Sequence, residues 1–468
     1  MFNDSLNPLS RRQFIERSAQ GLSAAALAGS AFSALAQQPG VRPPRTADVQ
    51  VINPRGRVPV GMIIDDSTCL VNLNRFSMPQ FDAAWVGENK TYQRTWKEWS
   101  PEIPDSFVRK FGEWSAANGV KGKYSIVPYP ACVGRLDREL PGWTRRELAD
   151  SIQLVRELMT PNWDIHPEMV THTRVIDLKT GHPYPEISLK FMENWEWTTG
   201  RSADEIAAYL SYALNILKNI GLTCEGITTP GGFGNKALPQ LAQATLQSVR
   251  DVYGAEIPHY FRHAYSEGGE SVAPRVEYAS GLDANDPRCV VSVIACTGDW
   301  TGGWDNVEPA SPDKFITADG QAGRMVDIIK RGEPAMMLAH WTGFYWLGRE
   351  LGFDVFKEAV RRLHEHYRDQ LHWMKLAELS RYWAAKELTR IERMGNTISF
   401  NAPYACTIFT VQLNATGETK QVSVEGGKRG LKKVESSTKL IEGTWCLDGG
   451  KVTACFDLPK GRSAISVS

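Results

Sequence analysis

Short apolar runs alternate with amphipathic helical patterns from about residue 57 to residue 390, and no other feature constrains the fold as strongly. The runs at 58–64, 123–127, 289–295 and 335–339 have the length and apolar content of buried strands. Apolar residues at helical spacing predict helices at 106–117, 144–159 and 202–220, and Thr144 with Glu147 forms a capping-box pattern. This alternation implies parallel β/α units, and their number favours a barrel over an open sheet.

The sequence changes character after about residue 390. Strand-like stretches separated by Gly and Asn turns fill 397–468, which predicts a small antiparallel β-sandwich. Residues 37–56 are polar and rich in proline, as a linker is. The expected organisation is a signal segment at 1–36, a linker at 37–56, a β/α barrel at 57–390 and a C-terminal β-sandwich at 391–468.

The N-terminal segment resembles a twin-arginine export signal. Arg11 and Arg12 precede a weakly apolar stretch at 21–36, which ends in the small-x-small pattern of a cleavage site. Cleavage is therefore expected between Ala36 and Gln37. The stretch is shorter than the roughly 20 apolar residues that span a membrane. We expect a periplasmic or secreted protein with no integral membrane segment after signal removal.

Composition excludes some classes of partner. Lys and Arg total 53 and Asp and Glu total 53, so the formal net charge is zero. A nucleic-acid-binding chain would carry a basic excess, and no such excess is present. The 15 Trp, 14 Tyr and 17 Phe suit a carbohydrate partner, because aromatic rings stack on sugar faces, although core packing is the expected role of most of them.

Two adjacent carboxylates, Asp65 and Asp66, follow the apolar run at 58–64. Neighbouring residues at a strand end point to opposite sides of the sheet, and carboxylates resist burial unless a cation or a metal pairs with them. Catalytic side chains of α/β barrels lie at this carboxyl edge. The alternative is a solvated turn, because Asp and Ser are common turn formers.

The order of five short motifs across about 58–350 resembles the polysaccharide deacetylase class of β/α barrels, also called NodB-homology or carbohydrate esterase family 4. Asp65 and Asp66 are similar to its first motif, an apolar residue followed by two aspartates. The stretch EMVTHT at 168–173, which we expect to be a short strand, is similar to its EIGNHT motif. The remaining motifs are matched by a helix followed by NGVKGK at 118–123, TTPGG at 228–232 and MLAH at 337–340. The resemblance implies a distorted (β/α) barrel of the NodB-homology type.

The resemblance also implies roles for four residues. Asp65 would be the general base and His340 the general acid, while Asp66 and His172 would bind a divalent metal, with zinc expected. The chemistry is coherent, because a metal polarises an acyl carbonyl while a carboxylate removes a proton and an imidazole protonates the leaving group.

Two positions depart from the family pattern. The second metal-binding histidine of the family falls on Ile176. A third ligand must therefore come from His166, from Asp177 or from elsewhere, and the sequence does not separate the two named residues. Thr228 stands where the family has the arginine that tethers the base. Arg174 is a candidate substitute for that arginine and is counted among the substrate-binding candidates.

Aromatic residues that follow predicted strand ends are candidates for a sugar subsite. They are Trp300, Trp304, Trp341 and Tyr345, with core packing as the alternative for each.

The sequence thus predicts an exported metal-dependent hydrolase that removes N- or O-acetyl groups from a poly- or oligosaccharide. One alternative is a glycoside hydrolase on the same barrel, in which Asp65 or Asp66 works with a distant carboxylate. The other is a carbohydrate-binding protein without catalysis, in which the metal set is incomplete.

The export signal can be tested directly. Replacing Arg11 and Arg12 with lysine should leave precursor in the cytoplasm, because the paired arginines define the signal. Mass spectrometry of the wild-type periplasmic protein should show a chain that begins near Gln37. Unimpaired export of the double variant would reject the assignment.

Overall fold

The computed structural model describes residues 42–66, 70–307, 310–415, 419–425 and 430–468. The twin-arginine segment and the cleavage site between Ala36 and Gln37 lie outside the described residues. Within the described part of the chain, no helix is both long enough and apolar enough to cross a membrane.

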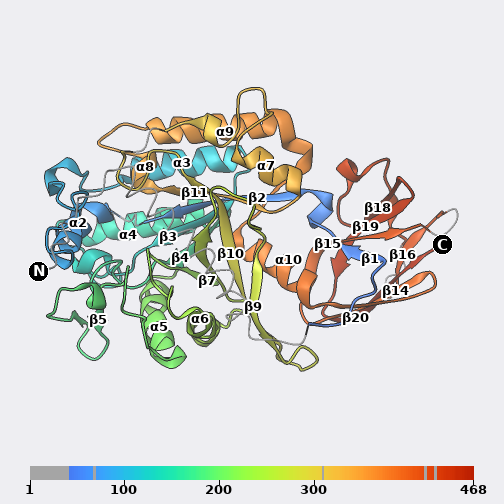
Figure 1. Cartoon of the computed structure of the whole chain (residues 1–468), viewed down its shortest axis with the longest axis horizontal. Helices are drawn as coiled ribbons and strands as arrows, with labels where there is room; N and C mark the ends of the chain where they lie inside the picture. Colours follow the sequence, from blue (N-terminus) through green and yellow to red (C-terminus); the bar gives the residue numbers. More distant parts are fainter. Residues whose placement is uncertain (1–41, 67–69, 308–309, 416–418, 426–429) are drawn as a thin grey trace, which may run out of the picture.

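Parallel strands form a nearly closed barrel, as the alternation of strands and helices predicts (Figure 1). Each strand runs parallel to its neighbour, and a parallel bridge between Glu168 and Thr228 joins the two ends of the order. In spatial order the strands are β4 (Trp163–Pro167), β3 (Gly122–Ile126), β2 (Val58–Asp65), β11 (Ala335–His340), β10 (Arg288–Asp299), β8 (His259–Ala264) and β7 (Gly226–Thr228). Two further strands, β12 (Leu371–Trp373) and β9 (Arg275–Ser280), pair with β2 and β10.

Amphipathic helices surround the strands, and their starts follow the expected signals. The capping boxes of Thr144 with Glu147 and of Ser202 with Glu205 both form. The helix expected at 144–159 is α-helical only to Leu154 and continues as a π-helical turn. The helices are α2 (Leu73–Ala84), α3 (Asp105–Ala117), α4 (Arg145–Leu154), α5 (Ala203–Asn219), α6 (Leu238–Tyr253), α7 (Arg324–Arg331), α8 (Trp341–Phe344) and α9 (Leu351–Tyr367).

Side chains of strand β4 point alternately toward the surrounding helices and into the barrel interior. Trp163 and Ile165 are buried in the apolar layer against the helices, where Trp163 contacts Phe111. Successive side chains of a strand point to opposite faces, so Asp164 and His166 point into the barrel. The segment at 168–173 that the motif places in a strand is instead the loop that follows β4, so that expectation was wrong. Pairing of 163–167 with β3 fixes the strand earlier in the chain.

The C-terminal residues form the expected β-sandwich, from two sheets in the order β1-β15-β19-β18-β17 and β13-β14-β20-β16. Strand β1 (Val49–Val51) lies in the predicted linker and pairs with β15, so the linker contributes to this domain. Val49 and Val51 are buried while Gln50 is exposed, the alternation of a half-buried strand. The other strands are β13 (Arg390–Met394), β14 (Thr397–Ala402), β15 (Cys406–Asn414), β16 (Val422–Glu425), β17 (Lys432–Lys433), β18 (Thr444–Asp448), β19 (Lys451–Leu458) and β20 (Gly461–Val467).

Helix α10 (Leu376–Leu388) lies between the barrel and the sandwich (Figure 1). Leu376 and Leu379 belong to the apolar cluster formed with β8, β9 and β10. Tyr382 belongs to the sandwich core and donates a hydrogen bond of 2.6 Å to the carbonyl of Ile52. The helix therefore packs on both domains and fixes the sandwich against the barrel.

Candidate active site

Acidic and histidine side chains converge at the carboxyl edge of the barrel. Asp65 ends β2, Asp299 ends β10 and His340 ends β11. The parallel register places His340 directly beside Asp65. Because the carboxyl ends of parallel strands meet at one edge, the fold brings these residues together, as in other α/β barrels.

Asp66, Glu168 and His172 form a buried group whose ligand-type atoms all lie within 4.8 Å of one another. The Nε2 atom of His172 lies 3.4 Å from Asp66 Oδ1 and 3.3 Å from Glu168 Oε1. The backbone N–H of Asp66 donates to Glu168 Oε2 at 3.0 Å. Two carboxylates and an imidazole in this arrangement could hold a divalent metal.

Two buried polar atoms of this group make no hydrogen bond. Asp66 Oδ2 is buried without a hydrogen-bond partner, as is His172 Nδ1. A buried carboxylate oxygen without a partner is costly unless a cation satisfies it. Burial by itself would lower the pKa of His172, but the hydrogen bond and charge of Glu168 and the charge of Asp66 raise it to about 9. The two carboxylates thus favour a positive charge where a metal would bind.

The backbone around this group is strained and is held by a buried glutamate. Asp66, Met169 and His172 have φ values of 65°, 53° and 62°, in the left-handed region that non-glycine residues seldom adopt. Glu193 accepts hydrogen bonds from the backbone N–H of Thr171 at 3.1 Å and of His172 at 2.6 Å. Its carboxylate therefore fixes the turn that aims His172 at Asp66.

Asp65 pairs with a buried lysine. Lys123 on β3 is fully buried and donates to Asp65 Oδ1, to Ser125 Oγ at 2.6 Å and to the carbonyl of Ile64 at 3.2 Å. Burial raises the pKa of Asp65 to about 6, and the charge of Lys123 opposes that rise. Asp65 is therefore ionised at neutral pH and can accept a proton there.

His340 is held by a second carboxylate. Its Nδ1 lies 2.7 Å from Asp299 Oδ2. Burial by itself would lower the pKa of His340, but the charge of Asp66 and the hydrogen bond with Asp299 raise it to about 10. The ring is therefore protonated at neutral pH and can donate a proton, with Nδ1 fixed by Asp299.

The two candidates for a third ligand lie outside the group of Asp66, Glu168 and His172. His166 points into the barrel and its Nε2 lies 3.0 Å from Nε2 of His259, and burial lowers the pKa of both imidazoles. Asp177 lies on β5 (Ile176–Asp177) and its Oδ1 accepts the N–H of Lys179. Glu168 instead occupies the third place.

Arg174 does not contact Asp65, as a residue that tethers the base would have to. Its guanidinium donates to the carbonyl of Tyr184, and the cation on Asp65 is Lys123. Arg174 remains a candidate for substrate contacts.

The candidate aromatic residues divide into buried and half-buried ones. Trp341 is fully buried, with its ring centroid 5.1 Å from Phe111 and 5.3 Å from Tyr124, so it packs in the core and offers no face to a sugar. Trp300 packs against Phe315 and Tyr345 against Phe107, and both keep part of their surface exposed.

A further cluster of rings begins at His172 and includes one predicted candidate, Trp304. Phe81 has its centroid 6.4 Å from the His172 ring and 5.1 Å from that of Trp195. This cluster, called here the rim aromatics, continues through contacting rings and consists of Phe81, Trp85, Tyr92, Trp195 and Trp304. Four of the five are half-buried, so they present ring surface near the site.

Four residues of the site are absent from the sequence-based assignment: Lys123, Glu168, Glu193 and Asp299. The sequence does carry a signal for Glu168. It follows Asp164 and His166 at every second position, so the three side chains point to the same face of an extended segment. Asp299 lies four residues beyond the predicted run at 289–295, and only the observed length of β10 places it at the carboxyl edge. Glu193 lies in a loop, where no periodicity marks it.

No protein-family model matches the chain, and no curated protein matches it. Among solved structures, a probable polysaccharide deacetylase from Pseudomonas aeruginosa PAO1 is 10% identical, with a TM-score of 0.39 over 70% of this chain and 91% of that chain. An alpha-L-fucosidase is 12% identical, with a TM-score of 0.32 over 89% of this chain and 97% of that chain. A glycoside hydrolase is 8% identical, with a TM-score of 0.33 over 90% of this chain and 96% of that chain. At these values none of the likenesses assigns a family or an activity to this chain.

The group of Asp66, Glu168 and His172 makes a specific prediction about metal content. Replacing any one of the three with alanine should lower bound zinc by one equivalent per chain, because each removes a ligand from a three-ligand site. The measurement is elemental analysis after chelation and reloading with zinc.

Asp177→Asn is the matched control, since it changes a nearby carboxylate outside the group. It should bind as much zinc as the wild type. Loss of zinc in Asp177→Asn with full retention in Glu168→Ala would reverse the assignment of the third ligand.

Proposed function

We propose that the protein is a divalent-metal-dependent hydrolase that removes N- or O-acetyl groups from a carbohydrate. One observation carries the proposal: a candidate metal triad lies beside an ionised carboxylate and a protonated imidazole at the carboxyl edge of a barrel. This combination supplies an electrophile, a base and an acid for hydrolysis of an acyl group.

The roles follow from the geometry. Asp66, Glu168 and His172 would hold the ion, which when bound would polarise an acyl carbonyl. Asp65 accepts a proton from the attacking water, and Lys123 keeps its carboxylate charged and oriented. His340 donates a proton to the departing amine or alcohol, and Asp299 holds the ring by Nδ1 so that Nε2 remains available.

The rim aromatics support a carbohydrate as substrate. Phe81 is buried against His172, and the half-buried rings of Tyr92 and Trp195 pack against Phe81. Aromatic faces stack on the apolar faces of sugars. Export by the twin-arginine pathway remains part of this proposal and would place the enzyme in the periplasm or outside the cell.

Substitution of the proposed acid and base tests the mechanism. Asp65→Asn and His340→Ala should each lower turnover of an acetylated oligosaccharide by on the order of 10²-fold or more, because each removes a proton-transfer group. Zinc content should not change. His182→Ala, at an exposed histidine of a loop hairpin, is the control and should keep wild-type turnover. Full turnover in His340→Ala would require another acid.

The pairing of Asp65 with Lys123 predicts the pH dependence. The base must be ionised, so kcat/KM should rise with pH through the pKa of Asp65, which burial raises to about 6 and a bound metal would lower. Lys123→Met removes the cation that opposes protonation, so the acid limb should move to higher pH. Ser125→Ala, which keeps the lysine, should move it less. An unmoved limb in Lys123→Met would show that Asp65 is not the base.

The released product separates the proposal from its rivals. Acetate without new reducing ends supports deacetylation, while reducing sugar without acetate supports a glycoside hydrolase that uses carboxylates of the same edge. Glycan binding that is unaffected by a chelator and by Asp65→Asn, with neither product formed, would support a carbohydrate-binding protein.

A further inference from the structure

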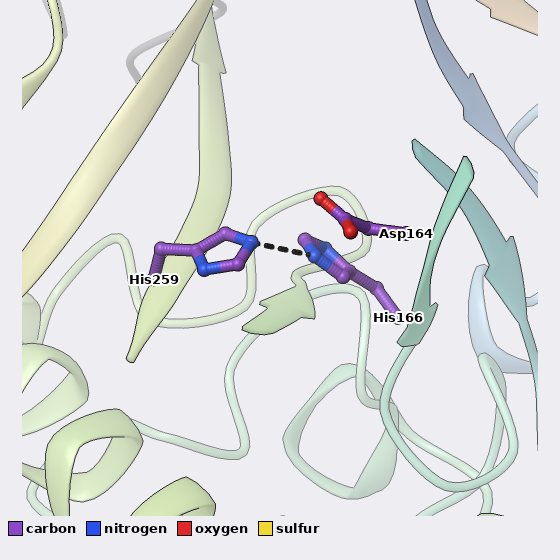
Figure 2. A group of neighbouring side chains, drawn as sticks. All are labelled: Asp164, His166 and His259. Carbon is purple, nitrogen blue, oxygen red and sulfur yellow. Dashed lines mark hydrogen bonds between the residues drawn. The ribbon is translucent and has the colours of Figure 1, made fainter. Parts of the chain in front are cut away.

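A second group of ligand-type side chains lies inside the barrel, beside the first residues of β7 and β8. Asp164 and His166 come from β4, and His259 is the first residue of β8. Figure 2 shows the two imidazoles pointing at one another, with the carboxylate of Asp164 beside His166. The ligand-type atoms of the three residues lie within 4.8 Å of one another.

A glycine leaves space at the two facing nitrogens. Gly226 is the register partner of His259 on the neighbouring strand β7. A Cβ atom at this position would lie 2.6 Å from Nε2 of His259 and 2.7 Å from Nε2 of His166, closer than real Cβ contacts come. Any other residue at 226 would therefore press on the atoms through which both rings could bind an ion.

The burial of the pair is unusual for polar side chains. His166 and His259 are both fully buried, and Nδ1 of His259 has no hydrogen-bond partner. Buried polar groups are stable when hydrogen bonds or a metal satisfy them. Nδ1 of His166 lies 3.4 Å from Thr228 Oγ1, a contact that orients the ring from its far side.

We propose that Asp164, His166 and His259 form a second metal site, separate from the group of Asp66, Glu168 and His172, and that it binds a structural zinc ion. Two imidazole nitrogens and a carboxylate oxygen are zinc ligands, and a solvent molecule can complete a tetrahedron. The two nitrogens now lie 3.0 Å apart, at hydrogen-bond distance. In a tetrahedral site with zinc–nitrogen bonds of roughly 2.0–2.1 Å they would be about 3.4 Å apart, so the rings need to separate by a few tenths of an ångström to bind the ion. The ion would link β4 to β8 across the short strand β7.

The surrounding charges set the conditions for binding. Lys375 Nζ lies 3.5 Å from Asp164 Oδ1, and the backbone N–H of Ala377 donates to Asp164 Oδ2 at 2.7 Å. The lysine is partly exposed and can withdraw to solvent, while the hydrogen bond from Ala377 fixes the carboxylate at the start of α10. Lys123 lies deeper in the barrel and is engaged by Asp65. Nitrogen-rich ligands favour zinc over magnesium or manganese here.

The test separates the two sites by their metal content. The purified full chain is stripped with a chelator, reloaded with zinc alone and analysed for bound metal. The double variant Asp66→Ala/His172→Ala removes the first site and should retain one equivalent per chain. In the same variant, zinc should raise the Tm, and cobalt should give the visible absorption of a four-coordinate site.

Adding His259→Ala to the double variant should abolish the remaining equivalent, the cobalt absorption and the zinc-dependent rise in Tm. His263→Ala on the same strand is the control, because His263 stacks on Tyr265 and lies outside the group; it should retain the equivalent. If the His259 variant fails to fold, Gly226→Ala tests the same site by crowding both nitrogens.

Two results would overturn the proposal. One is a folded Asp66→Ala/His172→Ala variant that binds no zinc or cobalt, which would leave the two histidines as a metal-free hydrogen-bonded pair. The other is retention of the equivalent when His259 is replaced. Neither result depends on catalytic activity, so both are independent of the proposed hydrolase function.

Discussion

Burial of several carboxylates at the carboxyl edge of the barrel is the constraint on which the site depends. Asp65, Asp66 and Glu168 are all buried there, and such charges are stable only when cations balance them. Lys123 balances Asp65, while Asp66 and Glu168 share His172. The same attraction that raises the pKa of His172 to about 9 would be available to a divalent ion in its place. Metal binding should therefore release a proton from this imidazole.

Strained turns of the backbone accompany this burial of charge. Asp66 and His172 both adopt left-handed backbone conformations, which cost on the order of 1–3 kcal/mol each for residues other than glycine. Rigid neighbours maintain them: the parallel register aligns β2 with β11, and Glu193 accepts the N–H groups of the His172 turn. Glu193 is itself held by the hydroxyl of Tyr209 on α5, so a helix on the outside of the barrel orients a ligand at its edge.

The sequence predicted the barrel and several of the residues at its carboxyl edge, because both follow from local patterns. Asp65 and His340 each end an apolar strand, and parallel strands end together, so their proximity could be inferred. Glu168 could not be assigned in the same way, because the strand was placed at 168–173 and only pairing with β3 fixes it at 163–167. Trp341 follows a strand end as expected, yet the following turn packs its ring into the core. The three-residue strand β1 depends on a partner in the C-terminal domain, which no local pattern reveals.

Strand β4 connects the two ends of the barrel interior. Asp164 and His166 on this strand point inward, as does Glu168 directly after it, in positions that barrels more often fill with branched apolar side chains. Lys123 is the register partner of Asp164, but its ammonium group reaches toward the carboxyl edge and pairs with Asp65. Asp164 instead accepts a hydrogen bond from the N–H of Ala377 at the start of α10 and pairs with Lys375, at the opposite end of the barrel interior. Because polar side chains replace apolar packing along this strand, the stability of the barrel depends on how completely cations and hydrogen bonds satisfy them.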